Sequence, residues 1–203
     1  MPPDSVHVPR EAVAVLFVCT ANICRSPMAE RLVSAMLAGR LGVQADQITV
    51  SSAGVVAREG EPMNPVAAAA LRGRGIDAGG FGARLLRPEH IVGSTLVLAA
   101  AREHRSAVAR LVPRAAARCF TVREFDRYST VVDITALPAH GPAPRLAALV
   151  DQVAGLRGSL SPVAPAADDV ADPYLLGESV MQSCAAQLAA ASQRWVEIVA
   201  RTG

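Results

Sequence analysis

One short stretch near the start of the chain constrains the fold more than any other. The apolar run Val13–Val18 ends at Cys19, and an amphipathic pattern follows from Pro27 to about Arg40. Proline suits the first turn of a helix, because its missing N–H would have no partner there. The pattern therefore predicts a buried strand, a short loop and a helix. Such a loop gathers backbone N–H groups and the positive end of a helix dipole around the cysteine sulfur.

The loop also carries a chemical motif, Cys-x5-Arg-Ser, formed by Cys19, Arg25 and Ser26. Five intervening residues let the backbone wrap a tetrahedral oxyanion, while the planar guanidinium of Arg25 can hold two oxygens of a phosphoryl group. The same N–H donors favour the thiolate of Cys19. A nucleophile and an anion cradle in one loop indicate phosphoryl transfer through a cysteinyl-phosphate. The residues expected to bind phosphate are Thr20, Ala21, Asn22, Ile23, Cys24, Arg25 and Ser26.

Strands and helices alternate along the rest of the chain. Further strands are predicted at 48–52, 95–99 and 118–122, and helices at 65–73, 102–112, 145–156 and 179–201. Repeated βα units favour a parallel sheet with helices on both faces. We therefore expect an α/β fold of three layers, α-β-α, around a central four-stranded parallel sheet. Right-handed crossovers then bring the C-terminal ends of all strands, and with them Cys19, to one edge.

The domain organisation is expected to be simple. Residues 1–10 lack the basic and apolar regions of a secretory signal and are interpreted as a loose leader. Residues 11–203 are predicted to form one domain. Within it, prolines punctuate residues 127–168, which are too short for a core of their own and are interpreted as an elaboration. This elaboration could shape the mouth of a pocket, cover another protomer or pad the surface.

Charge and hydropathy exclude some classes of partner. The formal net charge is +2, which gives no support to a nucleic-acid partner or an anionic membrane surface. No apolar run approaches the ~18 residues of a membrane-spanning helix. The sequence therefore predicts neither a nucleic-acid partner nor a membrane partner.

The cysteines and histidines do not suggest a metal or a cofactor. The four cysteines have no zinc-site spacing, and a disulfide framework does not suit a chain of this size without an export signal. A reducing, cytoplasmic location is expected, which suits a working thiolate. Cys119 and Cys184 are expected in the core. The histidines, which show no spacing typical of a ligand set, are His7, His90, His104 and His140.

The motif and its surroundings resemble the low-molecular-weight protein tyrosine phosphatase family. Val15–Glu30 is similar to the signature of that family, Ser52–Gly54 to its Ser-Ala-Gly turn, and Asp172–Tyr174 to its Asp-Pro-Tyr segment. The likeness covers residues 13–126 and 170–201. It implies the phosphotyrosine protein phosphatase I-like fold and a protein-tyrosine phosphatase, or one acting on another aryl or small-molecule phosphate.

The resemblance also implies roles for single residues. Cys19 would attack phosphorus, and Arg25 would stabilise the transition state. Asp172 would protonate the leaving oxygen and then activate the hydrolytic water, a step for which a positioned acid is worth about 10²–10⁴ in rate. Ser26 would donate a hydrogen bond to the thiolate, and Asn22 would hold the shape of the loop. No cofactor or metal is implied, and the partner would be a phosphorylated protein or a small phosphate.

Several residues depart from the family pattern or leave their role open. Leu175 stands where a second aromatic commonly follows Tyr174, so the walls that select phosphotyrosine are thinned. Tyr174 is expected to line the substrate pocket. Arg58 either faces an acidic substrate or is a solvated loop arginine. Cys24 could form a protective disulfide with Cys19, or it could simply fill space at the helix start.

Two other functions use the same motif. An arsenate reductase of the same fold would need a low-molecular-weight thiol, because residues 77–104 lack the cysteines of an electron relay. A non-catalytic phospho-binding module would be expected to have lost the nucleophile, the arginine or the acid, and all three are present. The physiological substrate and the oligomeric state do not follow from the sequence.

Overall fold

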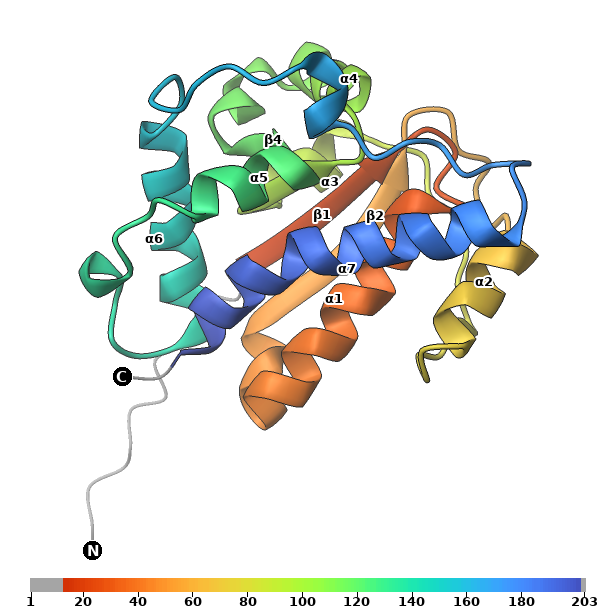
Figure 1. Cartoon of the computed structure of the whole chain (residues 1–203), viewed down its shortest axis with the longest axis horizontal. Helices are drawn as coiled ribbons and strands as arrows, with labels where there is room; N and C mark the ends of the chain where they lie inside the picture. The colour runs from red at the N-terminus through yellow and green to blue at the C-terminus, as the bar shows by residue number, and fades with distance from the viewer. Residues whose placement is uncertain (1–12, 202–203) are drawn as a thin grey trace, which may run out of the picture.

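The central strand β1 (Val13–Cys19) organises the sheet, in a computed structural model that describes residues 13–201 (Figure 1). It pairs in parallel with β2 (Ile48–Gly54) on one side and β3 (Leu96–Ala99) on the other, and β3 pairs with β4 (Cys119–Thr121). The order β2-β1-β3-β4 confirms the predicted four-stranded parallel sheet. The leader predicted at 1–10 lies outside the described residues.

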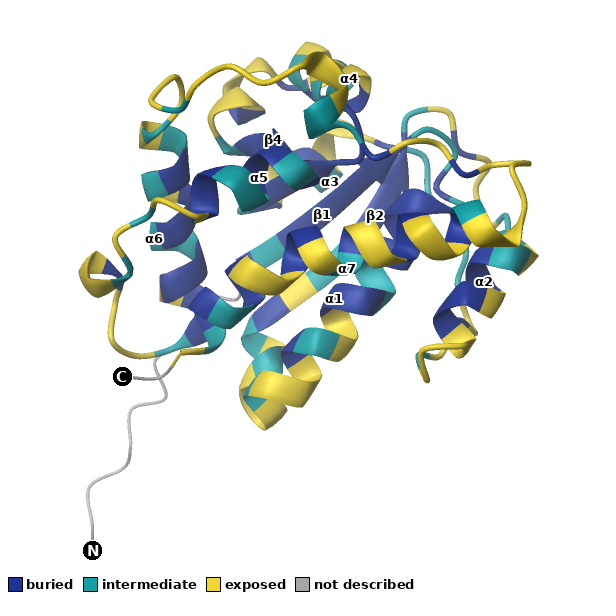
Figure 2. Cartoon of the chain, in the orientation of Figure 1, coloured by how far each residue is buried: buried dark blue, intermediate teal, exposed yellow. Residues whose placement is uncertain are grey.

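Helices cover both faces of the sheet, because successive side chains of β1 point to opposite sides. Val15 and Phe17 pack into a core with α1 (Arg25–Leu41) and α7 (Glu178–Ala200), whose Trp195 is fully buried. Leu16 and Val18 pack on the other face with α3 (Pro88–Val92) and α4 (Arg102–Leu111). Figure 2 shows the buried faces of the helices turned toward the sheet, so the three-layer architecture is confirmed.

The remaining elements connect these layers. α2 (Pro65–Arg72) and α5 (Val122–Ser129) both pack against α7. The predicted strand 118–122 is one residue too long at each end. Arg118 belongs to the preceding 3₁₀ turn, and Thr121 both ends β4 and caps α5 by accepting from the backbone N–H of Glu124. The short 3₁₀ turns are η1 (Gly42–Gln47), η2 (Pro113–Arg118), η3 (Ile134–Ala136) and η4 (Pro165–Asp168).

The proline-rich elaboration contributes one long helix, α6 (Pro142–Gly155), which begins three residues earlier than predicted. Gly141 precedes it at a φ of 80°, and proline at the first helical position is well tolerated. Buried Arg145 donates from Nε and Nη2 to the carbonyl of Ile198, and from Nη1 to that of Pro138. The carbonyl of Ile198 belongs to the last turn of α7, where no intrahelical donor remains and a cation is favoured. Arg145 therefore fastens the elaboration to the C-terminal end of α7.

Candidate active site

The Cys19 loop occupies the point where the strand order reverses. β1 has β2 on one side and β3 on the other, and its last residue is Cys19. The loop then leads directly into α1, which begins at Arg25. Open α/β sheets bind their ligands outside the carboxyl ends of the strands at such a switch point. The fold thus brings the sulfur to the position that the sequence predicted.

Backbone hydrogen bonds turn the carbonyls of the loop away from its centre. The carbonyls of Cys19 and Thr20 accept from the N–H groups of Val55 and Val56, both at 3.0 Å, and that of Ile23 accepts at 2.9 Å from the N–H of another loop. In the described part of the chain, the amides of residues 21–25 donate to no protein acceptor. Five free N–H groups at a helix start form an anion-binding concavity.

Asn22 holds this loop in shape from inside the protein. It lies in the left-handed region at a φ of 57° and is fully buried. Its Nδ2 donates to the hydroxyls of Ser26 and Ser52, both at 2.8 Å, and its Oδ1 accepts from the backbone N–H of Arg84 at 2.8 Å. A left-handed asparagine persists only where its surroundings over-determine it, and here its amide has three partners.

The same network sets the direction of the hydrogen bond at the sulfur. Because the Ser26 hydroxyl accepts from Asn22, its own proton remains available. The Cys19 sulfur lies 2.9 Å from that hydroxyl, whereas the carbonyl of Ala53 lies 3.4 Å away. Ser26 can therefore donate to a thiolate at Cys19.

Arg25 reaches across the loop to the segment that carries Asp172. Its side chain is only 4 % exposed, and its Nη2 lies 2.7 Å from the Oδ2 of Asp172. Nη2 also donates to the hydroxyl of Thr20 at 3.1 Å, and Nη1 donates to the carbonyl of Val170 at 3.3 Å. The residues that the sequence and the resemblance suggested as arginine and acid are thus direct neighbours.

Hydrogen bonds fix the segment before Asp172 to the end of β3 and to the start of α4. The backbone N–H of Val170 donates to Ala100 at 2.8 Å, and the carboxylate of Asp169 accepts from the backbone N–H of Arg102, the first residue of α4, at 2.8 Å. Beyond these hydrogen bonds, Asp172 is half exposed, and its Oδ1 accepts from a backbone N–H two residues on at 3.2 Å. The carboxyl group is held at its base and open to solvent at its tip.

A hollow of about 410 Å³ opens above the loop. Apolar groups of Ile23 and Val56 line it together with Cys19 and the other loop residues, and Arg58 and Tyr174 also line it. Both of these last two side chains are exposed. The elaboration at 127–168 contributes no lining residue, so of the three roles left open for it the structure does not support the one at the mouth of this pocket.

Cys24 lies in the same hollow but differs from Cys19 in character. All four cysteines are free and buried. Burial, reinforced by the proximity of Cys19, raises the pKa of Cys24 to about 12, so its resting form at neutral pH is the thiol. Burial also raises the pKa of Cys119 and of Cys184 to about 12. A protective disulfide between Cys19 and Cys24 and a space-filling role for Cys24 both stay open hypotheses.

One residue near the loop, His104, has a contact that the sequence pattern did not predict. His104, on α4, is 1 % exposed, and its Nε2 lies 2.9 Å from the hydroxyl of Thr20. The spacing of the histidines spoke only against a set of metal ligands and gave no sign of this contact. A histidine at the third position of a helix that follows a buried strand was the available signal, because that helix start lies beside the end of β1.

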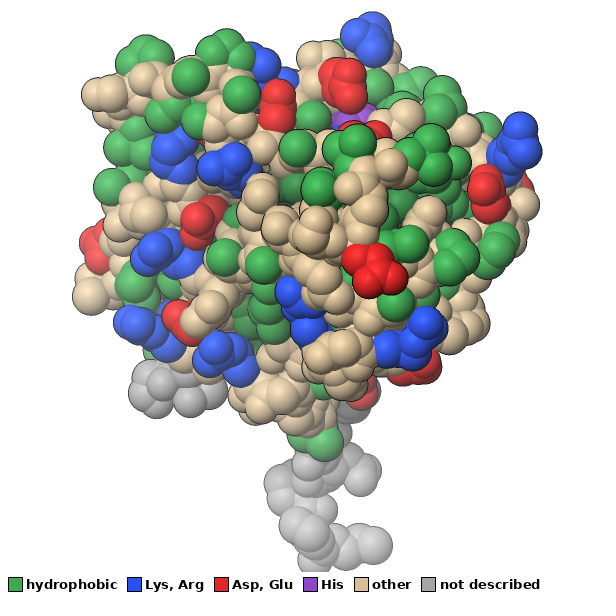
Figure 3. All heavy atoms as spheres, turned by 45° about the vertical axis from the view of Figure 1, so that its right-hand side comes forward, with side chains coloured by type: hydrophobic (Ala, Val, Ile, Leu, Met, Phe, Trp, Pro, Cys, Tyr) green, Lys and Arg blue, Asp and Glu red, His purple; other side chains and the backbone are tan. Residues whose placement is uncertain are grey.

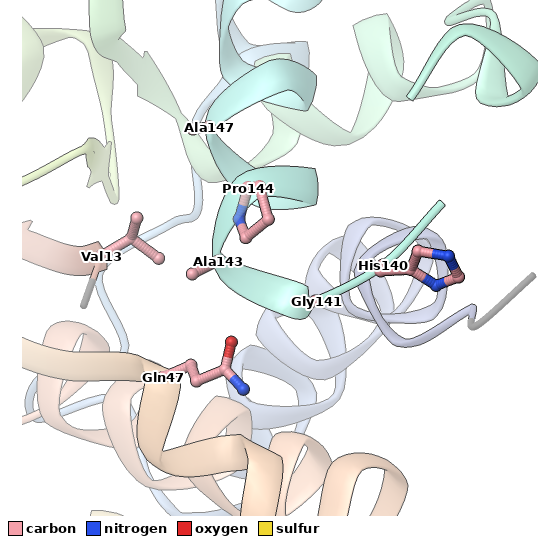
Figure 4. Close-up of a pocket in the computed structure, with 7 residues that line it drawn as sticks. All are labelled: Val13, Gln47, His140, Gly141, Ala143, Pro144 and Ala147. Atoms are coloured by element: carbon pink, nitrogen blue, oxygen red, sulfur yellow. The ribbon is translucent and has the colours of Figure 1, made fainter. Parts of the chain in front are cut away.

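A second hollow, of about 420 Å³, lies at the opposite edge of the sheet (Figure 4). Val13, the first residue of β1, lines it together with Gln47, His140 and small residues at the start of α6. It is separated from Cys19 by the length of β1. Its lining offers neither a thiol nor a guanidinium, so the candidate chemistry belongs to the Cys19 hollow.

The described residues also bear on partners and metals. Figure 3 shows acidic and basic side chains interspersed on the face it presents. Over residues 13–201, no helix is both long enough and apolar enough to span a bilayer. Within the same range, no three histidine, cysteine or acidic side chains are grouped as metal ligands.

Comparison with known families covers most of the chain. Residues 14–160 match the family model described as low molecular weight phosphotyrosine protein phosphatase. That match includes the Cys19 loop and ends before Asp172. The geometry at Arg25, and not the family model, therefore supports the relation of Asp172 to the loop.

Individual relatives include two kinds of phosphatase. A protein-arginine-phosphatase of Geobacillus stearothermophilus is 38 % identical over 111 residues, which are 55 % of this chain and 70 % of the relative. The low molecular weight protein-tyrosine-phosphatase Etp of Escherichia coli is 35 % identical over 100 residues, or 49 % and 62 % of the two chains. The crystal structure of a low molecular weight protein tyrosine phosphatase from T. tengcongensis superposes with a TM-score of 0.65 at 30 % identity, covering 92 % of this chain and 99 % of the other.

Proposed function

Because the chain belongs to the low molecular weight phosphotyrosine protein phosphatase family, we propose that Cys19, Arg25 and Asp172 are its catalytic residues. The chain is a cysteine-dependent phosphatase, and the arsenate-reductase alternative is not favoured because the matching family and relatives are phosphatases. The observation that carries the proposal is the 2.7 Å contact between Arg25 and Asp172 beside the free amides of the loop. The proposal treats residues 11–203 as one phosphatase domain, supported by a core that runs from Val13 to Val199.

The reaction proceeds in two displacements. In the first, the thiolate of Cys19 attacks phosphorus, the S–P bond forms, and the bond to the leaving oxygen breaks as Asp172 gives that oxygen a proton. In the second, Asp172 takes a proton from water as the water oxygen attacks phosphorus, and the S–P bond breaks to release phosphate and the thiolate. Arg25 and the amides of residues 21–25 stabilise the equatorial oxygens in both transition states.

The favoured substrate is a protein phosphotyrosine. The hollow combines the anion cradle with apolar walls at Ile23 and Val56 and an aromatic ring at Tyr174, which together suit a phenyl ring. Tyr174 is 48 % exposed, so an approaching protein segment can reach it. Arg58 in the same hollow would favour an acidic residue beside the phosphotyrosine.

A protein phosphoarginine is the second candidate. Glu61 lines the same hollow, and a carboxylate there could accept N–H groups from the guanidinium of a phosphorylated arginine. The relative named protein-arginine-phosphatase, at 38 % identity, also favours this candidate.

Turnover of three substrates tests both the chemistry and the choice between candidates. The wild-type protein should hydrolyse para-nitrophenyl phosphate, and Cys19→Ser should abolish the activity. Asp172→Asn, which keeps the shape but cannot donate a carboxyl proton, should lower kcat by about 10²–10⁴. Phosphotyrosine and phosphoarginine peptides of one sequence are then compared by kcat/KM, with Glu61→Gln expected to reduce only the phosphoarginine reaction. Full activity in the Cys19→Ser protein would refute the proposed mechanism.

A further inference from the structure

His104 joins two structural elements through the two nitrogens of its ring. Its Nδ1 accepts from the backbone N–H of Ala101 at 3.1 Å, an arrangement that closes the first turn of α4. Because Nδ1 is an acceptor, the proton of a neutral ring resides on Nε2. The Nε2 nitrogen lies 2.9 Å from the hydroxyl oxygen of Thr20 and 3.4 Å from a carboxylate oxygen of the exposed Glu103. The shorter contact makes Thr20 its partner.

The hydroxyl group of Thr20 links His104 to Arg25. Its hydroxyl oxygen accepts from His104 and also from the Nη2 of Arg25, at 3.1 Å. Both lone pairs of the oxygen are then used, and the hydroxyl proton is left to donate. Thr20 lines the hollow above the loop, so an anion bound there is the available acceptor.

The surroundings of His104 favour the neutral ring on which this arrangement depends. Burial lowers the pKa of His104, and the positive charge of Arg25 lowers it further. The carboxylates of Glu103, Asp172 and Asp169 act in the opposite direction. The net effect keeps Nε2 as the only protonated nitrogen at neutral pH, with its direction toward Thr20 set by the bond at Nδ1.

We propose that His104 is a positioning residue for the phosphatase site, which orients the Thr20 hydroxyl and, through it, the guanidinium of Arg25 toward the bound phosphoryl group. The inference rests on the proposed function of the Cys19 loop. His104 lies 84 residues from Thr20 along the chain, and its ring makes no contact with the sulfur or the acid among the described hydrogen bonds. Its action is therefore indirect.

Two substitutions of His104 separate this role from a structural one. The side-chain Nε2 of glutamine occupies the place of the ring Nε2, so His104→Gln keeps the donor to Thr20 and loses the acceptor for Ala101. The Oδ1 of asparagine occupies the place of the ring Nδ1, so His104→Asn keeps the helix contact and loses the donor. Each variant thus preserves one of the two hydrogen bonds.

We expect the two variants to differ in catalytic activity, because only His104→Gln keeps the donor to Thr20. His104→Asn should lower kcat/KM for para-nitrophenyl phosphate by about 10- to 100-fold, the range of a hydrogen bond within a charged network, while His104→Gln stays within about threefold of wild type. Thermal unfolding of both proteins checks that each is folded. If His104→Asn keeps full activity and His104→Gln loses it, the residue is structural and the proposal is wrong.

A double substitution tests whether the effect passes through Thr20. Thr20→Val keeps the shape of the side chain and removes the hydroxyl, so adding His104→Asn to it should cause no further loss, whereas two independent effects would multiply. The affinity for inorganic phosphate gives a readout without turnover. It is measured by calorimetry in wild type, Thr20→Val, His104→Asn and the double variant. A wild-type protein that binds phosphate but lacks turnover would count against the proposed function, and a weaker phosphate affinity of His104→Asn would still support this inference. Independent losses in the cycle would overturn it.

Discussion

Gly54 offers the sharpest test of the idea that the loop works through its backbone. This residue ends β2 and lies directly against the loop. A Cβ added there would lie 2.6 Å from the carbonyl oxygen of Thr20, 2.7 Å from the nitrogen of Asn22 and 2.8 Å from the carbonyl carbon of Ala21. All three atoms belong to the backbone, so no change of side-chain rotamer can relieve the overlap.

The size of the effect follows from these distances. Restoring an ordinary contact of 3.4 Å to the Thr20 oxygen requires the loop to move by about 0.8 Å. The loop amides would then miss the positions of the phosphoryl oxygens, and a misplacement of about 1 Å can cost roughly 10² in rate. We expect Gly54→Ala to lower kcat/KM for para-nitrophenyl phosphate about 100-fold. The overpacking should also lower the free energy of unfolding by about 1–3 kcal/mol.

Gly39→Ala is the matched control. A Cβ at Gly39, on the exposed side of α1, meets no atom within 4 Å. Replacing a helical glycine with alanine should leave activity unchanged and stabilise the protein by up to about 1 kcal/mol. Steady-state kinetics and urea unfolding of the three proteins give the comparison. A folded Gly54→Ala protein within threefold of wild-type kcat/KM would show that the loop does not depend on this contact.

One substitution and one change of pH probe parts of the fold that the mechanism does not use directly. Arg145→Met leaves the carbonyl of Ile198, at the end of α7, without its charged donor. We expect the free energy of unfolding to fall by about 2 kcal/mol, which calorimetry would record as a fall of about 4–8 °C in Tm. The value of kcat/KM should stay unchanged, because the elaboration lies far from the Cys19 loop. Equal stability of this variant and wild type would contradict the role given to Arg145. The lowered pKa of His104 means that the unfolded chain binds a proton that the folded protein does not, so stability should fall below about pH 6.5 by up to about 1.4 kcal/mol per pH unit. Urea unfolding at pH 7.5 and 5.5 should show this loss in wild type and a smaller loss in His104→Gln; identical losses would be inconsistent with a buried neutral ring.

The parts of the site that the sequence predicts well are those encoded by neighbouring residues. The apolar strand, Cys19, Arg25 and the helix start follow one another, and their geometry needs only the local rules for a strand end and a helix N-terminus. The parallel sheet followed from the alternation of apolar runs and amphipathic segments. These features depend on periodicity, which is visible in a single sequence.

Contacts between distant segments were predicted poorly or only by resemblance. Arg25 and Asp172 are 147 residues apart, and no spacing rule pairs them. α5 was missed although Thr121 and Glu124 form a capping box, because the apolar residues of the short strand before it obscured the helix start. In the elaboration, the prolines suggested irregular chain where they in fact begin α6.

The elaboration at 127–168 lies just before Asp172 in the chain, yet the position of Asp172 does not depend on the length of the elaboration. The insertion, residues 127–168, begins within α5, which directly follows β4. Its last residue, Asp168, forms a 3.0 Å ion pair with Arg127 of α5, and the backbone carbonyl of Asp168 accepts a hydrogen bond from the hydroxyl of Thr121. Both ends of the insertion are therefore fixed at the edge of the sheet that carries the Cys19 loop. Between these two points the insertion contains α6, whose buried residues belong to the main core, so only the loops on either side of that helix are free to change in length. Doubling the length of such a flexible loop costs only about 0.6 kcal/mol. Asp172 would then remain beside Arg25, because the ion pair of Asp168 and the contacts of Asp169 and Val170 hold the segment that carries the acid.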